Sequence, residues 1–122
     1  MAEHIQLGKQ GEDIAVEYLI QKGYYILDRN WRTGRYELDI VARLADVLVV
    51  VEVKTRQRRY QQTPDEAINY RKMLHLVRAS DRYVRMHGYK LKVRIDIIMV
   101  VIDNDGRATV DHLEDAIYPP VS

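Results

Sequence analysis

Three charged residues at the ends of apolar segments carry the most chemical information in this sequence. Glu52 and Lys54 end a mostly β-branched apolar segment that begins at Val47, and Asp39 lies in the segment before it. Alternate residues of a strand share a face, so the Glu52 and Lys54 side chains should point the same way. Such charges are rarely buried unless they are paired or bind a metal. Two carboxylates that can hold a divalent cation beside an ammonium group are typical of a phosphodiester-hydrolysing site.

The spacing of these residues suits a β-hairpin with residues 44–47 as its loop. In that register Asp39 lies opposite Glu52, and Glu37 lies opposite Lys54. Directly opposed Cβ atoms are about 4.5–5.5 Å apart, so the first pair could share one cation and the second could form an ion pair. A register shifted by one residue would separate the two carboxylates onto opposite faces, so the register is part of the hypothesis.

Alternation of polar and apolar residues predicts which side chains of the first hairpin strand share a face. Glu37 and Asp39 are expected on one face, with Leu38, Ile40 and Ala42 on the other.

The expected chemistry is metal-assisted hydrolysis. Mg²⁺ and Mn²⁺ prefer hard oxygen ligands, which Asp39, Glu52 and the backbone carbonyl of Val53 would supply. Lys54 would position the attacking water or stabilise the developing oxyanion. The basic residues that follow would hold flanking phosphates: Arg56, Arg58 and Arg59.

Two structural interpretations compete with this functional one. Glu52 and Lys54 could be the solvated face of an edge strand, or Glu37 and Lys54 could be a structural ion pair. Both lose weight because Leu48 and Val50 lie on the same strand face as Glu52. That face is apolar first and charged only at its end, as at the mouth of a cleft.

Charge is segregated along the chain although the net charge is only +1. Residues 29–94 contain 16 Lys and Arg against 7 Asp and Glu, whereas both flanks are acidic. A basic centre suits a polyanionic partner, with solvated surface charge as the alternative. Four arginines with helical spacing form a stripe that has the same two readings: Arg71, Arg78, Arg82 and Arg85.

Composition narrows the class of protein. The 122 residues, 47% hydrophobic and 30% charged, are expected to form a single domain, 1–122, with a frayed tail at 119–122. The absence of Cys excludes disulfides and thiolate-bound zinc. There is no apolar run of membrane-spanning length and no secretory pattern, so no membrane association and a cytoplasmic location are expected. The four His residues have no metal-ligand spacing.

Periodicity and turn signals predict an α/β domain with the order αβββαββ, a mixed sheet flanked by helices. Thr63-Pro64-Asp65-Glu66 is a capping box that should start the second helix, and Gly88 should end it. The expected elements are a helix at 6–22, a strand at 24–27, a polar connection at 29–35, strands at 36–43 and 48–55, a helix at 63–87, a strand at 94–102, a turn at 103–106 and an edge strand at 109–113.

The residues also resemble a known family across residues 6–102. The chain is similar to the YraN-like family of predicted endonucleases, small bacterial proteins related to archaeal Holliday-junction resolvases. These belong to the restriction-endonuclease-like superfamily, whose site has the pattern D…(D/E)-x-K. The matching segments are Gly8-Lys9-Gln10-Gly11-Glu12, Gly23-Tyr24, Arg29-Asn30-Trp31-Arg32, Glu37-Leu38-Asp39-Ile40-Val41, Val51-Glu52-Val53-Lys54-Thr55-Arg56, Pro64-Asp65-Glu66-Ala67-Ile68 with Lys72, and Arg94-Ile95-Asp96-Ile97.

This resemblance implies roles for individual residues. Asp39 and Glu52 would be metal ligands and Lys54 the catalytic lysine. Glu12 matches the acid that resolvase-like nucleases bring from their first helix, and Glu37 matches the first acid of the family's G-E-I-D segment. An exposed helix carboxylate is the alternative for Glu12.

Two further basic residues in the matching segments, Arg32 and Lys72, are expected to contact nucleic acid, with a solvated lysine as the alternative for Lys72. The chain departs from the family at Tyr36 and Thr63, where glycine is usual, so the two loop geometries are expected to differ.

These observations predict a restriction-endonuclease-like, metal-dependent endonuclease that acts on DNA, including branched or otherwise structured DNA, with Mg²⁺ or Mn²⁺ as cofactor. Related resolvases act as dimers because a junction is cut at two symmetric positions, so a homodimer is one expected assembly. Two alternatives stay open. One is a nucleic-acid-binding module with little catalytic activity, and the other is a protein-interaction scaffold with a basic face.

Overall fold

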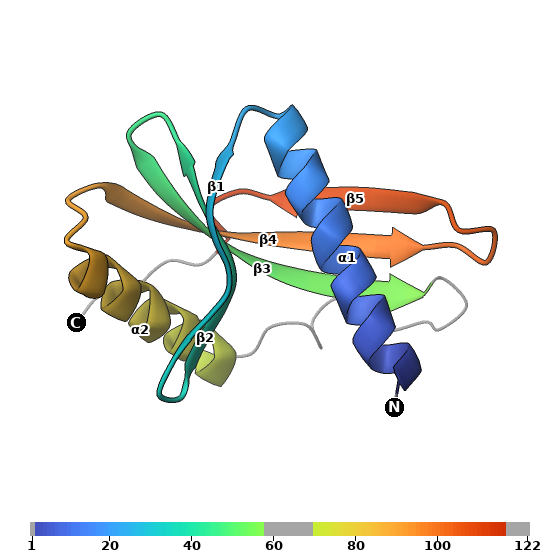
Figure 1. Cartoon of the computed structure of the whole chain (residues 1–122), viewed down its shortest axis with the longest axis horizontal. Helices are drawn as coiled ribbons and strands as arrows, with labels where there is room; N and C mark the ends of the chain where they lie inside the picture. Colours follow the sequence, from blue (N-terminus) through green and yellow to red (C-terminus); the bar gives the residue numbers. More distant parts are fainter. Residues whose placement is uncertain (1, 58–69, 117–122) are drawn as a thin grey trace.

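The computed structural model describes residues 2–57 and 70–116, which form one five-stranded sheet and two helices (Figure 1). The strands lie in the order β1-β2-β3-β4-β5, and every neighbouring pair is antiparallel except β3 and β4, which are parallel. This confirms the predicted α/β class and the order αβββαββ. The elements are α1 (Ala2–Gln21), β1 (Tyr25–Thr33), β2 (Tyr36–Leu44), β3 (Val47–Gln57), α2 (Tyr70–His87), β4 (Lys92–Ile102) and β5 (Ala108–Leu113).

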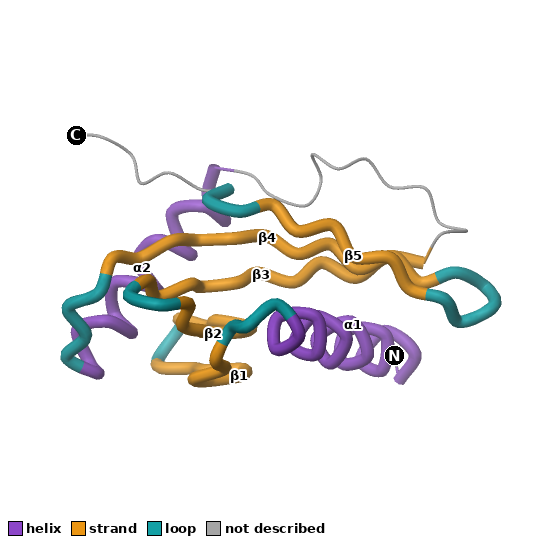
Figure 2. Tube along the Cα trace, turned by 90° about the horizontal axis from the view of Figure 1, so that it is seen from above, coloured by secondary structure: helices purple, strands orange, loops and turns teal. Residues whose placement is uncertain are grey.

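Each face of the sheet is covered by one helix. Ala15 and Leu19 of α1 pack on Val49 and Val51 of β3, and Figure 2 shows α1 against one side of the layer formed by β3, β4 and β5. The other face is covered by α2, whose buried side chains are Leu76, Ala79, Ser80 and Tyr83. All four residues of β3 from 48 to 51 have no exposed surface, because the strand is central and covered on both faces.

The predicted hairpin register is confirmed where the two strands pair. Arg43 lies opposite Leu48, and the ladder runs from Leu44 and Val47 to Ile40 and Val51. It ends there. Asp39 and Glu52 are therefore the first residues beyond the paired part of the hairpin.

The first strand is longer than the sequence suggested. Residues 29–33, expected in a polar connection, continue β1, and only residues 34–35 form the turn before β2. Gly34 takes the positive φ of 58° that such a short hairpin turn needs. An edge strand keeps part of its surface in water, so its polar side chains did not require a loop.

In both strands of the β1–β2 hairpin, the alternation of side chains between the two faces of the sheet is interrupted at one point. Leu38 packs with α2, but Ile40 and Ala42 pack with α1, so the expectation that these three side chains share a face was wrong. The ladder between β1 and β2 skips Asn30 and Asp39, and Asn30 has a φ of 51°. A non-glycine residue with positive φ interrupts the regular alternation of a strand.

The neighbours of Asn30 show the same change. Arg29 reaches Asp13 on α1 at 2.6 Å, whereas Trp31 packs edge-on against Tyr83 on α2. The local irregularity therefore lets consecutive parts of one hairpin contribute to the cores on both sides of the sheet.

A buried polar network lies at the β4–β5 side of the sheet. Asp96, with no exposed surface, accepts two hydrogen bonds from Arg94 at 2.9 Å and one from the Asp115 backbone N–H at 2.9 Å. His112 Nε2 lies 2.7 Å from the same carboxylate, and its Nδ1 lies 3.1 Å from the Tyr18 hydroxyl. The network therefore ties α1, β4 and β5 together.

Several predictions concern residues outside the part of the chain that the structure describes. These are the capping box at Thr63, the basic residues Arg58 and Arg59, and the tail at 119–122. Among the described residues no helix is long and apolar enough to cross a membrane.

Candidate functional site

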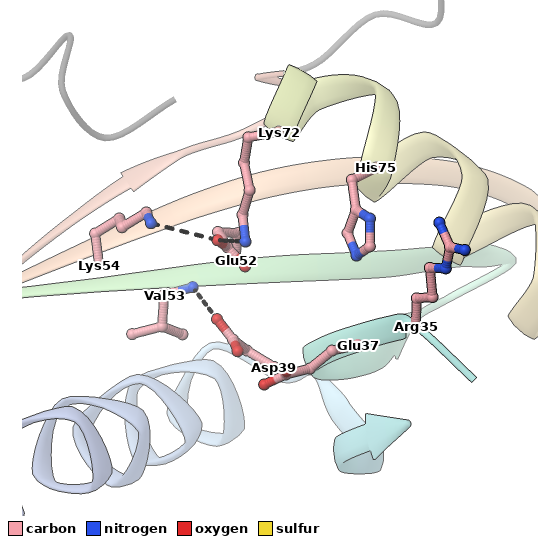
Figure 3. A pocket seen from close by; sticks show the side chains of 8 residues that line it. All are labelled: Arg35, Glu37, Asp39, Glu52, Val53, Lys54, Lys72 and His75. Carbon is pink, nitrogen blue, oxygen red and sulfur yellow. Dashed lines mark hydrogen bonds and ion pairs between the residues drawn. The ribbon is translucent and has the colours of Figure 1, made fainter. Parts of the chain in front are cut away.

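A cavity of about 260 Å³ lies where β2 and β3 separate beneath the first turns of α2 (Figure 3). Six of the residues predicted to form the site line it, together with two that were not predicted, Arg35 and His75. The full lining is Arg35, Glu37, Asp39, Glu52, Val53, Lys54, Lys72 and His75. We call this space the site cavity.

Asp39 links β2 to β3 just beyond the last residue pair of their ladder. Its Oδ2 accepts the backbone N–H of Val53 at 2.9 Å, beyond the last residue pair of the β2–β3 ladder. Burial and, after it, the nearby charge of Glu52 raise the pKa of Asp39 to about 7, although the hydrogen bond from Val53 acts in the opposite direction. The raised pKa means that the Asp39 carboxyl is buried beside a second acid, with too little positive charge nearby to compensate its own negative charge.

Glu52 is nearly buried, with 4% of its surface exposed, and is held by two lysines. Its Oε2 lies 3.5 Å from Lys54 Nζ and 3.1 Å from Lys72 Nζ. Figure 3 shows both ammonium groups directed at this carboxylate, one from β3 and one from α2. Two cations thus compensate a charge that would otherwise be costly to bury.

The expected ion pair between Glu37 and Lys54 is not formed in the structure. Lys54 contacts Glu52 instead, and Glu37 lies 3.6 Å from Arg32 on the neighbouring strand β1. The cause is the early end of the β2–β3 ladder, because Glu37 no longer lies opposite Lys54 once the strands separate.

Glu12 approaches the acidic side of the site from α1. Burial raises its pKa, a hydrogen bond from the Asn30 side chain lowers it, and the charge of Glu37 raises it. Glu12 is thus electrostatically coupled to the site without lining the site cavity. Asn30 was missed as a site residue. Asparagine tolerates positive φ better than most residues, and this is the one signal in the sequence that could have indicated its role.

Gly11 allows α1 to come this close. A Cβ atom at that position would lie 1.8 Å from Thr55 Oγ1 on β3, which is far inside contact distance. The glycine preceding Glu12 therefore has a steric reason, since it lets the helix backbone lie against the strand that carries Glu52 and Lys54.

Arg32 and Arg56, the other predicted nucleic-acid contacts within the described residues, do not line the site cavity. Arg56 donates to the carbonyl of Thr55 at 3.0 Å, and the exposed Arg32 pairs with Glu37. Lys72, by contrast, is part of the site cavity itself.

A hard divalent cation at this place would have few protein ligands and would be held mostly by water. Within residues 2–57 and 70–116 no three His, Cys, Asp or Glu side chains are grouped so as to hold a metal. A metal here would rely on Asp39, Glu52 and the backbone of Val53. Mg²⁺ commonly uses one or two carboxylates and keeps several waters, and the raised pKa of Asp39 marks a place where added positive charge would be favourable.

The fold and site define an α/β protein that carries an acid–acid–lysine cavity at the end of a hairpin. Its family follows from comparison with known sequences. The model of "Uncharacterised protein family UPF0102" matches residues 11–100, and the chain belongs to this family.

Curated relatives span nearly the whole chain and carry the same family name. A UPF0102 protein of Bacteroides thetaiotaomicron is 48% identical over 121 residues, covering 99% of both chains. One of Phocaeicola vulgatus is 44% identical over 121 residues, again covering 99% of both chains. One of Flavobacterium psychrophilum is 42% identical over 118 residues, covering 97% of this chain and 98% of its own.

Proposed function

We propose that this protein is a metal-dependent nuclease that hydrolyses phosphodiester bonds in DNA, including branched or otherwise structured DNA. The observation that carries the proposal is the convergence of Asp39, Glu52 and Lys54 on one cavity, although they come from two strands whose pairing has already ended. Paired carboxylates can hold a divalent cation, and an adjacent lysine can stabilise the charge that develops in phosphoryl transfer.

Each residue has a defined part in this proposal. Asp39 and Glu52, with the Val53 backbone, would hold Mg²⁺ or Mn²⁺, which supplies Lewis acidity and charge neutralisation when bound. Lys54, 3.5 Å from Glu52, would stabilise the negative charge that develops on the phosphate. Glu37 would orient the attacking water from the acidic side of the cavity, and Glu12 would act on the site through its charge, from α1.

The proposal extends to fold relationship and assembly. A hairpin that carries D…E-x-K, followed by a helix and a strand parallel to its second arm, supports kinship with restriction-endonuclease-like nucleases and the resolvases among them. A homodimer that cuts two symmetric positions and a cytoplasmic location are further parts of this proposal.

The test is cleavage of linear, nicked and four-way branched DNA with Mg²⁺ or Mn²⁺. Asp39→Asn and Lys54→Ala should each lower the rate at least about 100-fold, as loss of a charge-stabilising group does elsewhere. Lys90→Ala removes an exposed lysine that does not line the site cavity and should leave the rate unchanged.

Two results would contradict the proposal. Binding of DNA without cleavage of any substrate would favour a nucleic-acid-binding module. Failure to bind nucleic acid at low salt, where phosphate contacts are strongest, would favour a protein-interaction scaffold.

A further inference from the structure

A row of arginines runs along the exposed side of α2 and begins beside the site cavity. Four side chains seven, four and three residues apart share this exposed side of the helix, away from the buried Leu76 and Tyr83. Asp81 is the one acidic residue of α2, and it pairs with the last arginine at 2.9 Å. We call this set the α2 arginine row: Arg71, Arg78, Arg82 and Arg85.

Two aromatic contacts connect the row to the site cavity. His75 lines the cavity, and its ring centre lies 5.5 Å from that of Tyr36. The guanidinium of Arg82 lies 5.6 Å from the centre of the same tyrosine ring, a cation–π contact. This contact fixes Arg82 on the side of α2 that borders the hairpin β1–β2. Lys72 and His75 thus reach the cavity from the first turns of α2 (Figure 3), and the exposed arginines of the same helix continue from there to its last turn.

The row has the length of a short duplex segment. At 1.5 Å per residue, the distance along the helix from residue 71 to residue 85 is about 21 Å. Duplex DNA presents one phosphate per strand about every 3.4 Å along its axis, so the row spans about six base pairs. A helix is stiff, and a duplex of this length is equally straight.

We propose that the α2 arginine row binds the backbone of a duplex DNA arm of about six base pairs that extends from the phosphate in the site cavity. The inference rests on the proposed function, since it takes the cavity as the place of the scissile phosphate. Arginine matches phosphate geometry with two parallel hydrogen bonds, and contacts to phosphate read no sequence. The arm is therefore recognised by its double-stranded form and its length.

The first experiment measures DNA affinity in EDTA and in Ca²⁺, so that it does not depend on cleavage. The variant Arg71→Gln/Arg78→Gln/Arg82→Gln is compared with Lys9→Gln/Arg43→Gln/Lys92→Gln, which removes the same charge from exposed residues on α1, β2 and β4. Each phosphate contact contributes about 0.9 to the slope of log affinity against log salt. The α2 variant should therefore lose about 2.7 in slope, and the control variant should lose less than about 0.5.

The second experiment varies the length of the duplex arm on hairpin substrates from three to twelve base pairs. Affinity for the native protein should rise to about six or seven base pairs and then level off, and the α2 variant should lose this dependence. Equal slopes for the two triple variants, or single-stranded flanks that bind as tightly as duplex ones, would overturn the inference. So would an acidic protein that binds the row while duplex DNA does not.

The two proposals fail in different ways. If no DNA is ever cut but the salt slope and length dependence follow the α2 arginine row, duplex binding by the row stands, whereas the nuclease proposal and the scissile phosphate in the cavity fall. If Asp39→Asn abolishes cleavage while both triple variants bind alike, the nuclease stands and the duplex surface falls.

Discussion

The Asp39 carboxylate accepts a hydrogen bond from the backbone N–H of Val53 at 2.9 Å, at the point where β2 and β3 no longer pair. A side chain thus occupies the position that a strand carbonyl would take if the ladder continued. Beyond this hydrogen bond β2 and β3 separate, and the space between them is the site cavity. A buried carboxyl group thus replaces a backbone hydrogen-bond partner at this position. Its burial should lower the free energy of unfolding.

Asp39→Asn should stabilise the protein at neutral and alkaline pH. The pKa of Asp39 is raised from 3.8 to about 7, so the folded state retains a proton that the unfolded state loses. The free energy of unfolding should therefore fall as pH rises from about 4 to 7, and the loss should persist above pH 7. Asparagine keeps an oxygen acceptor for Val53 but carries no charge, so the gain at pH 8 should be about 2–4 kcal/mol.

Urea unfolding at pH 8 and at pH 4.5 measures this effect, and the difference between native protein and variant should shrink at the lower pH. Asp105→Asn, at an exposed pair with Arg107, is the control and should change little at either pH. An Asp39→Asn variant that is less stable than the native protein at pH 8 would mean that the carboxylate is already neutralised.

Lys72→Gln should increase the affinity for Mn²⁺. The Lys72 ammonium lies 3.1 Å from Glu52 Oε2 and so competes with any cation that uses this oxygen. Its removal should tighten Mn²⁺ binding about tenfold, which corresponds to about 1.4 kcal/mol. Titration of free Mn²⁺ by electron paramagnetic resonance reads this directly, without DNA.

Arg35→Gln is the matched control for Lys72, because Arg35 also lines the site cavity. An equal gain in both variants would point to the general positive field of the cavity rather than to competition at Glu52. Weaker Mn²⁺ binding in Lys72→Gln would show that the lysine supports the metal site.

Gly11→Ala should destabilise the protein because α1 and β3 are in direct contact there. The new Cβ would meet Thr55 Oγ1 at 1.8 Å, and such overpacking typically costs about 1–3 kcal/mol. Gly8→Ala tests the same change one turn earlier, where nothing lies within 4 Å, and should be neutral or stabilising by up to about 1 kcal/mol. Denaturant midpoints that move together in the two variants would contradict the steric role of Gly11.

Asp96→Ala should be the most destabilising of these substitutions. It removes the carboxylate that holds Arg94, His112 and the Asp115 backbone, and among the described residues it leaves the largely buried guanidinium of Arg94 with the exposed Glu114 as its partner acid, at 3.2 Å. Breaking a buried ion pair on one side costs about 3–5 kcal/mol. Thermal and urea unfolding should both show the loss, whereas Asp105→Ala at the exposed Arg107 pair should cost less than about 0.5 kcal/mol.

The element order and the hairpin register could be predicted because both depend on local patterns. Side-chain alternation and the length of the turn between β2 and β3 were sufficient to place Arg43 opposite Leu48. The same reasoning identified five of the eight residues that line the site cavity, since strand neighbours bring Asp39, Glu52 and Lys54 together, and Lys72 was predicted from the family resemblance alone.

The remaining features depend on contacts that periodicity does not encode. A regular alternation placed Leu38 and Ile40 on one face, but the positive φ of Asn30 shifts the neighbouring strand by one face at that point. The contact of Lys72 with Glu52 is a packing result, because it depends on where α2 crosses the sheet. Arg35 enters the site through a turn whose geometry is set by Gly34.

The parallel pairing of β3 with β4 has a consequence for the order of folding. These strands match over eleven residue pairs, yet the chain between Gln57 and Lys92 must close a long loop before the first pair can form. The β2–β3 hairpin closes over a short turn, and local contacts form faster than distant ones. We therefore expect Asp39 and Glu52 to meet early in folding. Lys72 should join them only with the late crossover, so that for a brief interval the two acids face each other with Lys54 but without Lys72.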